Sequence, residues 1–385
     1  IYDRHENVQH FSWNERGQLA RISGDNEALD VELEYDALSG RLCAVYQAYD
    51  GARHLLVSYR FNEQGQLIAV TDADGIVTRQ FGWDQASEMM AWHAYATGLK
   101  VQYQWRPDAN SRHWRVEAYQ VLDDRGEVLE RWRIDADETQ RRARVSNDEG
   151  VSSEHHWDEL FRITAYTDLH GGKWQFRWAG NTEQLLAMVQ PDGASWEYAW
   201  DARGNLTMER DPLGRTTLTS WHPLYAFPLK EVLPDGAIWQ YEYNVAGDVV
   251  KLTDPEGGVT RFEWNAQGDL LRRIDALENS HRFWWDALGQ LIREEDCSGY
   301  QSRNQYDASG KLISTTDPLG NSERYIWSPA GRLQTWIRAD GRETLFSYNH
   351  AGLLCGQNID GLLERKVTLN ARGQVIEAID PAGQV

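Results

Sequence analysis

Cysteine, lysine and methionine are all scarce in this chain of 385 residues. Its three cysteines, Cys43, Cys297 and Cys355, are far apart and never form a C-x-x-C pair. This spacing argues against a disulfide framework and against a structural zinc site. No apolar run approaches the ~20 residues that span a bilayer, and the N-terminus has none of the features of a signal peptide. The sequence gives no indication for or against contact with a membrane.

Positive charge is also in short supply, since 59 acidic side chains face 39 basic ones and the formal net charge is −20. Affinity for a phosphate backbone comes largely from clustered lysine and arginine. The charge balance therefore argues against nucleic acid as a partner. The negative net charge favours solubility and is compatible with binding a basic polypeptide as cargo.

Aromatic residues and glycine, by contrast, are abundant, with 18 Trp, 17 Tyr and 32 Gly. Aromatic side chains favour half-buried strands, and glycine supplies the turns between strands. Alternation supports this assignment, because Trp239, Tyr241 and Tyr243 would lie on one face of a strand. The composition predicts an all-β protein.

A motif of the form aromatic–Asp/Asn–x–x–Gly–x–Leu recurs every 21 or 22 residues in the second half of the chain. It occurs at Trp200-Asp201 with Gly204, Tyr243-Asn244 with Gly247, Trp264-Asn265 with Gly268, Trp285-Asp286 with Gly289, Tyr306-Asp307 with Gly310, and Tyr348-Asn349 with Gly352. A fixed period of this length is the signature of a repeat architecture.

A second turn motif follows eleven residues after the first. It reads Asp-Pro-x-Gly at Asp211 to Gly214, Asp254 to Gly257 and Asp317 to Gly320. Aspartate hydrogen-bonds its own downstream backbone, proline fixes φ near −65°, and glycine supplies positive φ. Each repeat is therefore predicted to contain two strands and two turns.

The predicted architecture is one long antiparallel sheet of hairpins, with about 17 repeats and about 34 strands. At ~4.8 Å between strands the sheet would be ~160 Å wide, and rolled into one turn it would form a ring of ~50 Å diameter. Sheets of this width curl because strand twist accumulates. We therefore expect a spiral wall around a cavity, or a coiled ribbon that needs a partner on one face.

The repeats divide the chain into two parts. We expect residues 1–156 to hold irregular repeats and residues 157–385 to hold regular ones, together forming one continuous shell segment. Residues 85–154 fit the period least well. Both ends of the chain fall within repeats, so we expect it to be a segment of a larger protein.

These motifs resemble the YD repeats of the Rhs family, and most closely those of Rhs effectors of bacterial type VI secretion. The resemblance implies a hollow β-cocoon shell that encloses a C-terminal toxin domain before delivery in interbacterial competition. It implies as partners that toxin domain and the remaining shell segments of the same gene product, and a VgrG-type spike protein and a secretion chaperone through regions absent here. The protein would be made in the bacterial cytoplasm and exported to a target cell.

No enzyme activity is predicted for this segment, because the self-cleaving core region and the toxin domain of the family are not found in it. Asp72-Ala73-Asp74-Gly75 resembles the start of a calcium-binding loop but lacks the closing glutamate, so we interpret it as a turn. His155-His156 and Gly171-Gly172-Lys173 likewise lack the partners that a metal site or a phosphate loop requires. No catalytic residue, cofactor or metal is predicted.

An alternative function is a cell-surface carbohydrate-binding or adhesive module, because Trp and Tyr faces stack on sugar rings. Cross-strand packing explains the recurring aromatic residues without a ligand. The residues expected to matter are the repeated turn glycines, turn aspartates and strand aromatics named above.

Overall fold

The computed structural model describes residues 1–25, 29–107 and 113–384. The predicted parts 1–156 and 157–385 include residues 26–28, 108–112 and 385, which lie outside the described residues. The described chain forms a single sheet of 34 strands, and no helix in it has the length and apolar character needed to cross a membrane. Strands that follow one another in the sequence pair antiparallel, so every described strand except the first and the last has a partner on both sides. The predicted all-β hairpin array is confirmed.

The first strands are β1 (Gln9–Trp13), β2 (Leu19–Gly24), β3 (Asp30–Tyr35), β4 (Leu42–Tyr49), β5 (Ala52–Phe61), β6 (Leu67–Asp72), β7 (Val77–Trp83), β8 (Met90–Tyr95), β9 (Lys100–Pro107), β10 (Trp114–Leu122), β11 (Val128–Asp137) and β12 (Arg142–Asn147). The next are β13 (Ser152–Trp157), β14 (Ile163–Thr167), β15 (Lys173–Trp178), β16 (Leu185–Val189), β17 (Ser195–Trp200), β18 (Leu206–Arg210), β19 (Thr216–Trp221), β20 (Pro228–Val232), β21 (Ile238–Tyr243), β22 (Val249–Thr253) and β23 (Val259–Trp264). The last are β24 (Leu270–Ile274), β25 (Ser280–Trp285), β26 (Leu291–Glu295), β27 (Gln301–Tyr306), β28 (Leu312–Thr316), β29 (Ser322–Trp327), β30 (Leu333–Ile337), β31 (Glu343–Tyr348), β32 (Leu354–Ile359), β33 (Leu362–Leu369) and β34 (Val375–Ile379).

The repeat aromatic marks a recurring irregularity in the ladder of paired residues. Trp285 pairs with Leu291, and the register shifts between Trp284 and Trp285. The same shift occurs beside Trp200, Tyr243 and Trp264. Because a bulge increases the local twist and bends the strand, its recurrence beside the repeat aromatics curls the sheet in one direction.

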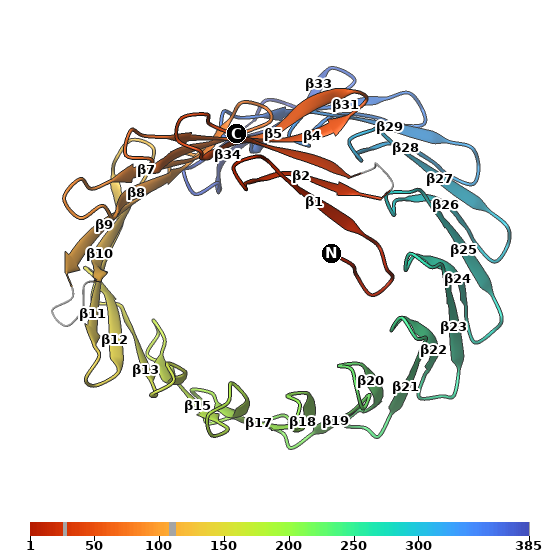
Figure 1. The fold of residues 1–385 in the computed structure, drawn as a ribbon, viewed down its shortest axis with the longest axis horizontal. Coiled ribbons are helices and arrows are strands. Elements are labelled where there is room, and N and C mark those ends of the chain that lie inside the picture. The colour runs from red at the N-terminus through yellow and green to blue at the C-terminus, as the bar shows by residue number, and fades with distance from the viewer. Residues whose placement is uncertain (26–28, 108–112, 385) are drawn as a thin grey trace.

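The curled sheet winds into a ring around an open centre, and the last strands overlap the first (Figure 1). Contacts along the overlap join the end of β6 to the turn after β29, and the end of β4 to the turn after β27. Both pairs of strands are 23 apart in the sequence order. The predicted spiral wall is confirmed. One revolution contains 23 strands, which at ~4.8 Å per strand gives a ring diameter of ~35 Å. The ring is therefore narrower than the ~50 Å expected if the whole sheet formed a single turn.

The spiral has two rims, made of the turns at the two ends of the strands. The YD rim contains the turns after the odd-numbered strands, from 14–18 to 370–374, and the DP rim contains the turns after the even-numbered strands, up to 380–383. Few of the described side chains are buried, and the buried hydrophobic ones among them are Leu122 and six alanines. The described wall is therefore one sheet thick and has no enclosed core.

Candidate functional site: the inner wall and the seam between coils

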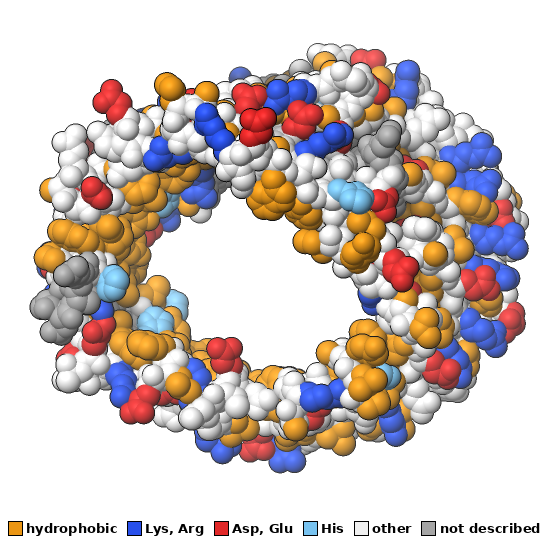
Figure 2. All heavy atoms as spheres, in the orientation of Figure 1, with side chains coloured by type: hydrophobic (Ala, Val, Ile, Leu, Met, Phe, Trp, Pro, Cys, Tyr) orange, Lys and Arg blue, Asp and Glu red, His pale blue; other side chains and the backbone are white. Residues whose placement is uncertain are grey.

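The inner wall of the spiral is the first candidate surface. Figure 2 shows hydrophobic side chains gathered along the inner rim of the opening, and Lys and Arg side chains on the outside. The strands supply such a face by alternation, since in β21 the aromatic Trp239 and Tyr241 are half-buried while Gln240 and Glu242 are exposed. Side chains on the concave face of a curved sheet crowd together, which accounts for half-burial without a covering layer. We infer that the aromatic face lines the opening.

Polar groups are also held within this aromatic face. Tyr241 donates a hydrogen bond of 2.7 Å to Glu231. Partial burial, together with this neighbouring carboxylate, raises the pKa of Tyr241 to about 12. The phenol therefore remains protonated, and the wall combines apolar rings with hydrogen-bonding groups.

The repeat aromatics do more than pack. Trp285 Nε1 donates a hydrogen bond of 2.7 Å to the backbone carbonyl of Leu270, the first residue of the preceding strand β24. The pairs of β24 with β25 end at Arg272, so Leu270, which pairs with Trp264 of β23, lies beyond the part of β24 that pairs with β25. The indole N–H of Trp285 therefore binds the Leu270 carbonyl from β25, and this bond joins one hairpin to the previous one.

This bond recurs along the array, with the donor 15 or 16 residues after the acceptor. Donors are Tyr35, Trp83, Trp105, Trp178, Trp200, Trp221, Tyr243, Trp264, Trp285, Tyr306, Trp327 and Tyr348. All of these residues carry an N–H or O–H donor. Sequence analysis assigned them to packing alone and missed the bond; the preference for Trp and Tyr over Phe at this position is the signal for it.

The turn residues predicted from sequence occupy equivalent places in every repeat. Trp200, Tyr243, Trp264, Trp285, Tyr306 and Tyr348 are each the last residue of an odd-numbered strand. Asp201, Asp286 and Asp307 follow such strands directly, and Asp211, Asp254 and Asp317 follow even-numbered strands. Gly204, Gly214, Gly247, Gly257, Gly268, Gly289, Gly310, Gly320 and Gly352 all have positive φ.

One turn shows the local physics. Asp286 Oδ1 accepts hydrogen bonds from the backbone N–H groups of Leu288 (2.8 Å) and Gln290 (3.0 Å). Gly289 has a φ of 70° and donates its N–H to the Asp286 carbonyl at 3.1 Å. The carboxylate satisfies backbone donors that the strand ladder does not reach, and glycine adopts the left-handed conformation at low cost.

The seam is the line along which the DP rim of the first coil meets the YD rim of the last coil. One contact lies at the N-terminal turn, where Arg4 and His5 bind Asp248 at 2.8 and 2.9 Å. Burial raises the pKa of Asp248, but hydrogen bonds from Asn244 and His5 and the nearby positive charges outweigh it, so the net pKa is lowered. Asp248 therefore holds its negative charge inside the seam.

A second contact involves the turn that resembled a calcium loop. Arg332 donates to Asp72 at 2.7 Å and also binds Asp74. Asp74 in addition accepts from Ser328 Oγ at 2.7 Å and from the Ala330 N–H at 2.9 Å. Burial raises the pKa of Asp74, and these donors lower it further than burial raises it. Here the two aspartates bind an arginine of the neighbouring coil.

Two repeat glycines also make room for the seam. A Cβ on Gly268 would lie 2.5 Å from the His5 ring, and one on Gly352 would lie 2.4 Å from the Arg332 guanidinium. The seam continues through Arg372, which binds Glu130. Sequence analysis did not identify the pairs that cross the seam, because Arg4 and Asp248, like Glu130 and Arg372, are more than 240 positions apart.

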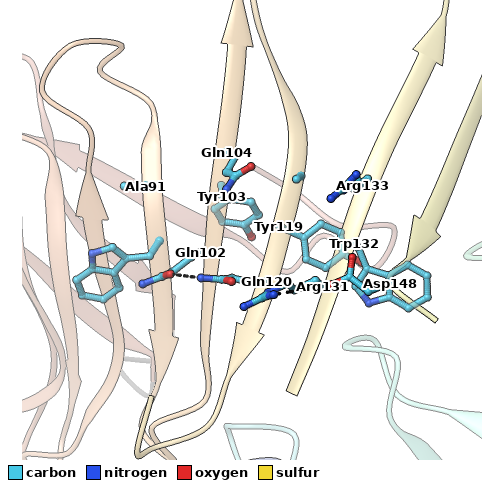
Figure 3. A pocket seen from close by; sticks show the side chains of 12 residues that line it. Ala91, Gln102, Tyr103, Gln104, Tyr119, Gln120, Arg131, Trp132, Arg133 and Asp148 are labelled. Atoms are coloured by element: carbon cyan, nitrogen blue, oxygen red, sulfur yellow. Dashed lines mark hydrogen bonds and ion pairs between the residues drawn. The ribbon is translucent and has the colours of Figure 1, made fainter. Parts of the chain in front are cut away.

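A hollow of about 640 Å³ lies on the irregular part of the sheet, over β8–β12. Gln102, Gln120 and Arg131 lie side by side on neighbouring strands (Figure 3). Gln120 donates to Gln102 at 2.7 Å, and Arg131 lies 3.9 Å from Asp148. Ala118, one row along, leaves space at the floor because its side chain is small.

An indole borders the same row. Trp92 pairs with Gln102 across the strands and with Gly82 on its other side. A Cβ on Gly82 would lie 2.0 Å from Trp92 Nε1, so glycine is required for the indole to lie against the sheet. Lys100 Nζ lies 4.1 Å from the centre of the Trp92 ring. Amides, cations and an aromatic face thus border one hollow.

The other motifs considered from sequence make contacts that stabilise the local structure. His155 stacks on Tyr166 with ring centres 4.5 Å apart, and His156 lies 2.8 Å from Glu154. Gly171 lies in a turn closed by its N–H and the Asp168 carbonyl. Within residues 1–25, 29–107 and 113–384, no group of three or more His, Cys, Asp or Glu side chains is placed to hold a metal ion.

Comparison with known proteins identifies the repeat. A family model described as RHS Repeat matches residues 184–216, 228–259, 243–279 and 285–322. The chain is 32% identical over 148 residues to Double-stranded DNA deaminase toxin A of Burkholderia cenocepacia (strain H111), a match that covers 38% of this chain and 10% of that protein. It is also 32% identical over 148 residues to Toxin protein Tse5 of Pseudomonas aeruginosa, covering 34% of this chain and 11% of that protein.

The chain thus spans about a tenth of the length of these curated relatives. Among solved structures, the crystal structure of TcdB2-TccC3-TEV matches 98% of this chain and 22% of its own chain, with a TM-score of 0.59 and 16% sequence identity. At this identity the likeness concerns the fold. It agrees with the long, open hairpin sheet described above.

Proposed function

Because this chain is an RHS-repeat protein, we propose that it forms part of the wall of a shell that encloses the C-terminal toxin domain of the same polypeptide. The observation that carries the proposal is the open centre of the spiral with its apolar lining (Figures 1 and 2). The similarity to two bacterial proteins named as toxins supports it.

The chemistry of the wall suits such a role. Exposed apolar surface is costly in water, and the inner face has no second layer over it among the described residues. An enclosed polypeptide would cover part of this face. The contacts within the wall are made by backbone ladders, turn aspartates and the Trp or Tyr hydrogen bonds, so closure does not depend on the cargo.

The finer parts of the proposal concern delivery. In it, the complete protein is made in the bacterial cytoplasm, is loaded on a VgrG-type spike with help from a secretion chaperone, and is exported by a type VI secretion system during interbacterial competition. Its division into irregular repeats over 1–156 and regular repeats over 157–385 belongs to the same proposal. The repeated Gly, Asp and aromatic residues would act by building the wall.

Limited proteolysis of the complete gene product tests enclosure. We expect a polypeptide outside the repeats to resist protease while the wall is folded and to be digested once urea opens the wall. The matched control is the same polypeptide expressed without the repeats, which should be digested at once. Rapid digestion of every non-repeat segment beside an intact wall would contradict the proposal.

A second candidate function, binding of carbohydrate, is favoured by the hollow beside Trp92 (Figure 3). An aromatic face with amide and guanidinium donors can stack on a sugar ring and bind its hydroxyl groups. A glycan array with the wild-type chain and Trp92→Ala tests it. Binding that the substitution abolishes would support this function, and absence of binding to any glycan would contradict it.

A further inference from the structure

A set of basic residues recurs on the outer face of the sheet. Three cross-strand pairs lie in successive hairpins: Lys251 with Arg261, Arg272 with Arg282, and Arg293 with Arg303. With Arg324, which follows Arg303 by one period of 21 residues, we name them the basic array. In β25 the aromatic Phe283 and Trp285 alternate with Arg282, so the array points away from the opening. Figure 2 shows Lys and Arg side chains gathered on the outer surface where Figure 1 places β23–β27.

The fold itself does not require basic residues at these positions. In earlier hairpins the equivalent pairs are Met208 with Leu218 and Ala187 with Glu197. Like charges directly opposite each other destabilise a sheet, so the basic array costs stability that other repeats avoid. It does so in a chain whose net charge is −20. An anion bound over the pairs would offset this repulsion.

Carboxylates of the wall neutralise only one end of the basic array. A glutamate lies 2.7 to 3.7 Å from each member on β22–β25, namely Lys251, Arg261, Arg272 and Arg282. At the other end, Arg293 lies 3.5 Å from the centre of the Trp284 ring, and Arg303 and Arg324 are exposed. No ion pair of these three arginines occurs among the described residues. Their positive charge is therefore available to a partner.

The same end of the basic array borders exposed apolar side chains of the outer face. Ile326 lies two residues after Arg324 in β29 and pairs with Thr335, which pairs in turn with Leu345 of β31. Ile326 is 49% exposed and Leu345 is 41% exposed. The outer face thus offers guanidinium groups and, directly beside them, aliphatic side chains.

We infer that the outer face over β26–β31 docks on an anionic lipid surface. In this contact Arg293, Arg303 and Arg324 bind the phosphate groups of the lipids, while Ile326 and Leu345 enter the headgroup layer. Guanidinium groups bind phosphate through two parallel hydrogen bonds and are weakly hydrated, which suits them to such a layer. The contact uses the outer face and does not depend on what the opening of the spiral contains.

The shape of the wall allows this contact. Arg293, Arg303 and Arg324 lie on β26, β27 and β29, which span ~14 Å of arc. Over that arc a ring of ~35 Å diameter departs from a flat surface by only ~2 Å, well within the thickness of a headgroup layer. Further hairpins would extend the sheet at β1 or β34, and further coils would meet the rims, so continuation of the wall leaves the outer face open.

A lipid surface fits this face better than a nucleic acid or an acidic protein. A nucleic acid backbone offers no apolar layer to Ile326 and Leu345. An acidic protein would have to carry carboxylates at the spacing of the repeat, whereas a lipid surface presents phosphate groups all along the array. The net charge of the chain does not prevent the contact, because charges more than about 10 Å apart are largely screened at ordinary ionic strength.

Flotation of the chain with lipid vesicles tests the inference. Wild type should float with vesicles of equal parts phosphatidylglycerol and phosphatidylcholine, less so as salt is added, and should not float with phosphatidylcholine alone. The array variant Arg293→Gln/Arg303→Gln/Arg324→Gln should bind the anionic vesicles about a hundredfold more weakly. The control variant Arg60→Gln/Arg144→Gln/Arg177→Gln removes the same charge from exposed positions on β5, β12 and β15, and it should float like wild type.

Two further measurements separate docking from loss of structure. The array variant should melt no earlier than wild type, because the substitutions remove like-charge repulsion. The variant Ile326→Thr/Leu345→Thr keeps every charge and should also bind the anionic vesicles more weakly.

Three results would overturn the inference. They are a wild-type chain that does not float with anionic vesicles, equal losses in the array and control variants, and binding to double-stranded DNA or polyglutamate as tight as binding to the vesicles. None of them bears on enclosure, whose test measures protection from protease.

Discussion

The indole N–H of Trp285 binds the carbonyl of Leu270 at 2.7 Å and thereby joins two successive hairpins. Because equivalent bonds recur from Tyr35 to Tyr348, the wall is held by side chains as well as by its backbone ladder. The ring also carries part of the apolar inner face. One side chain per repeat thus contributes both to the strength of the wall and to its lining.

Replacing the donor tests this role. Trp285→Phe keeps an aromatic ring but leaves the Leu270 carbonyl without its donor, which should lower the free energy of unfolding by about 1–2 kcal/mol. Urea denaturation followed by circular dichroism measures the change. The matched control is Trp284→Phe, because Trp284 stacks with Arg293 on the other face and its indole N–H has no equivalent bond among those described. Equal losses for the two variants would show that ring volume alone matters.

Substitutions at the left-handed turn position should change the stability in opposite directions, depending on whether glycine is removed or introduced. Gly289 has a φ of 70°, so Gly289→Val should destabilise by about 1–2 kcal/mol. Phe161 occupies the equivalent place in its turn with a φ of 61° and is largely exposed, so Phe161→Gly should stabilise by about 1 kcal/mol. Thermal melts of both variants measure these changes, and a stabilised Gly289→Val would contradict the turn assignment.

The seam can be weakened at Arg332, which also donates to the Gly352 carbonyl of its own coil at 3.2 Å. Arg332→Gln removes the charged partner of Asp72 and Asp74. Hydrogen bonds to charged groups contribute about 1.5–3 kcal/mol, so amide exchange at the turns 72–75 and 328–332 should become roughly tenfold faster or more. Arg342→Gln is the control, because Arg342 pairs only with Asp340 of its own turn among the described contacts. Unchanged exchange at both turns would show that the coils do not depend on this pair.

Acid should open the seam before it unfolds the sheet. The pKa values of Asp74 and Asp248 are lowered in the folded chain. Their contribution is therefore fully present above the unfolded pKa of ~3.9 and is lost as the pH falls through the lower folded values. Small-angle scattering between pH 6 and 2 should show the spiral opening below about pH 4, while the far-ultraviolet spectrum retains strand signal. An opening centred near pH 6 would point instead to histidine.

Much of the fold could be predicted from sequence because its determinants are local. The spacing of Trp264, Trp285 and Tyr306, the turn aspartates and the alternation in β21 all act within one or two hairpins. The expected 34 strands agree with the 34 that the structure contains. The spiral itself followed from the width of the sheet.

The seam could not be predicted in the same way. Which residue meets Arg332 depends on the number of strands in one revolution, and that number depends on small twists summed over 23 strands. An error of two strands would place a different turn opposite Arg332. The partners of Arg4, His5 and Glu130 are likewise set by the accumulated geometry of the ring.

The most direct test of the central claim is a cryo-EM map of the complete gene product, with mass spectrometry of the polypeptides that copurify. The account predicts a spiral β-wall whose opening contains density for a polypeptide other than the repeats, in contact with the aromatic face. A wall that is fully formed around an opening containing only solvent would contradict enclosure.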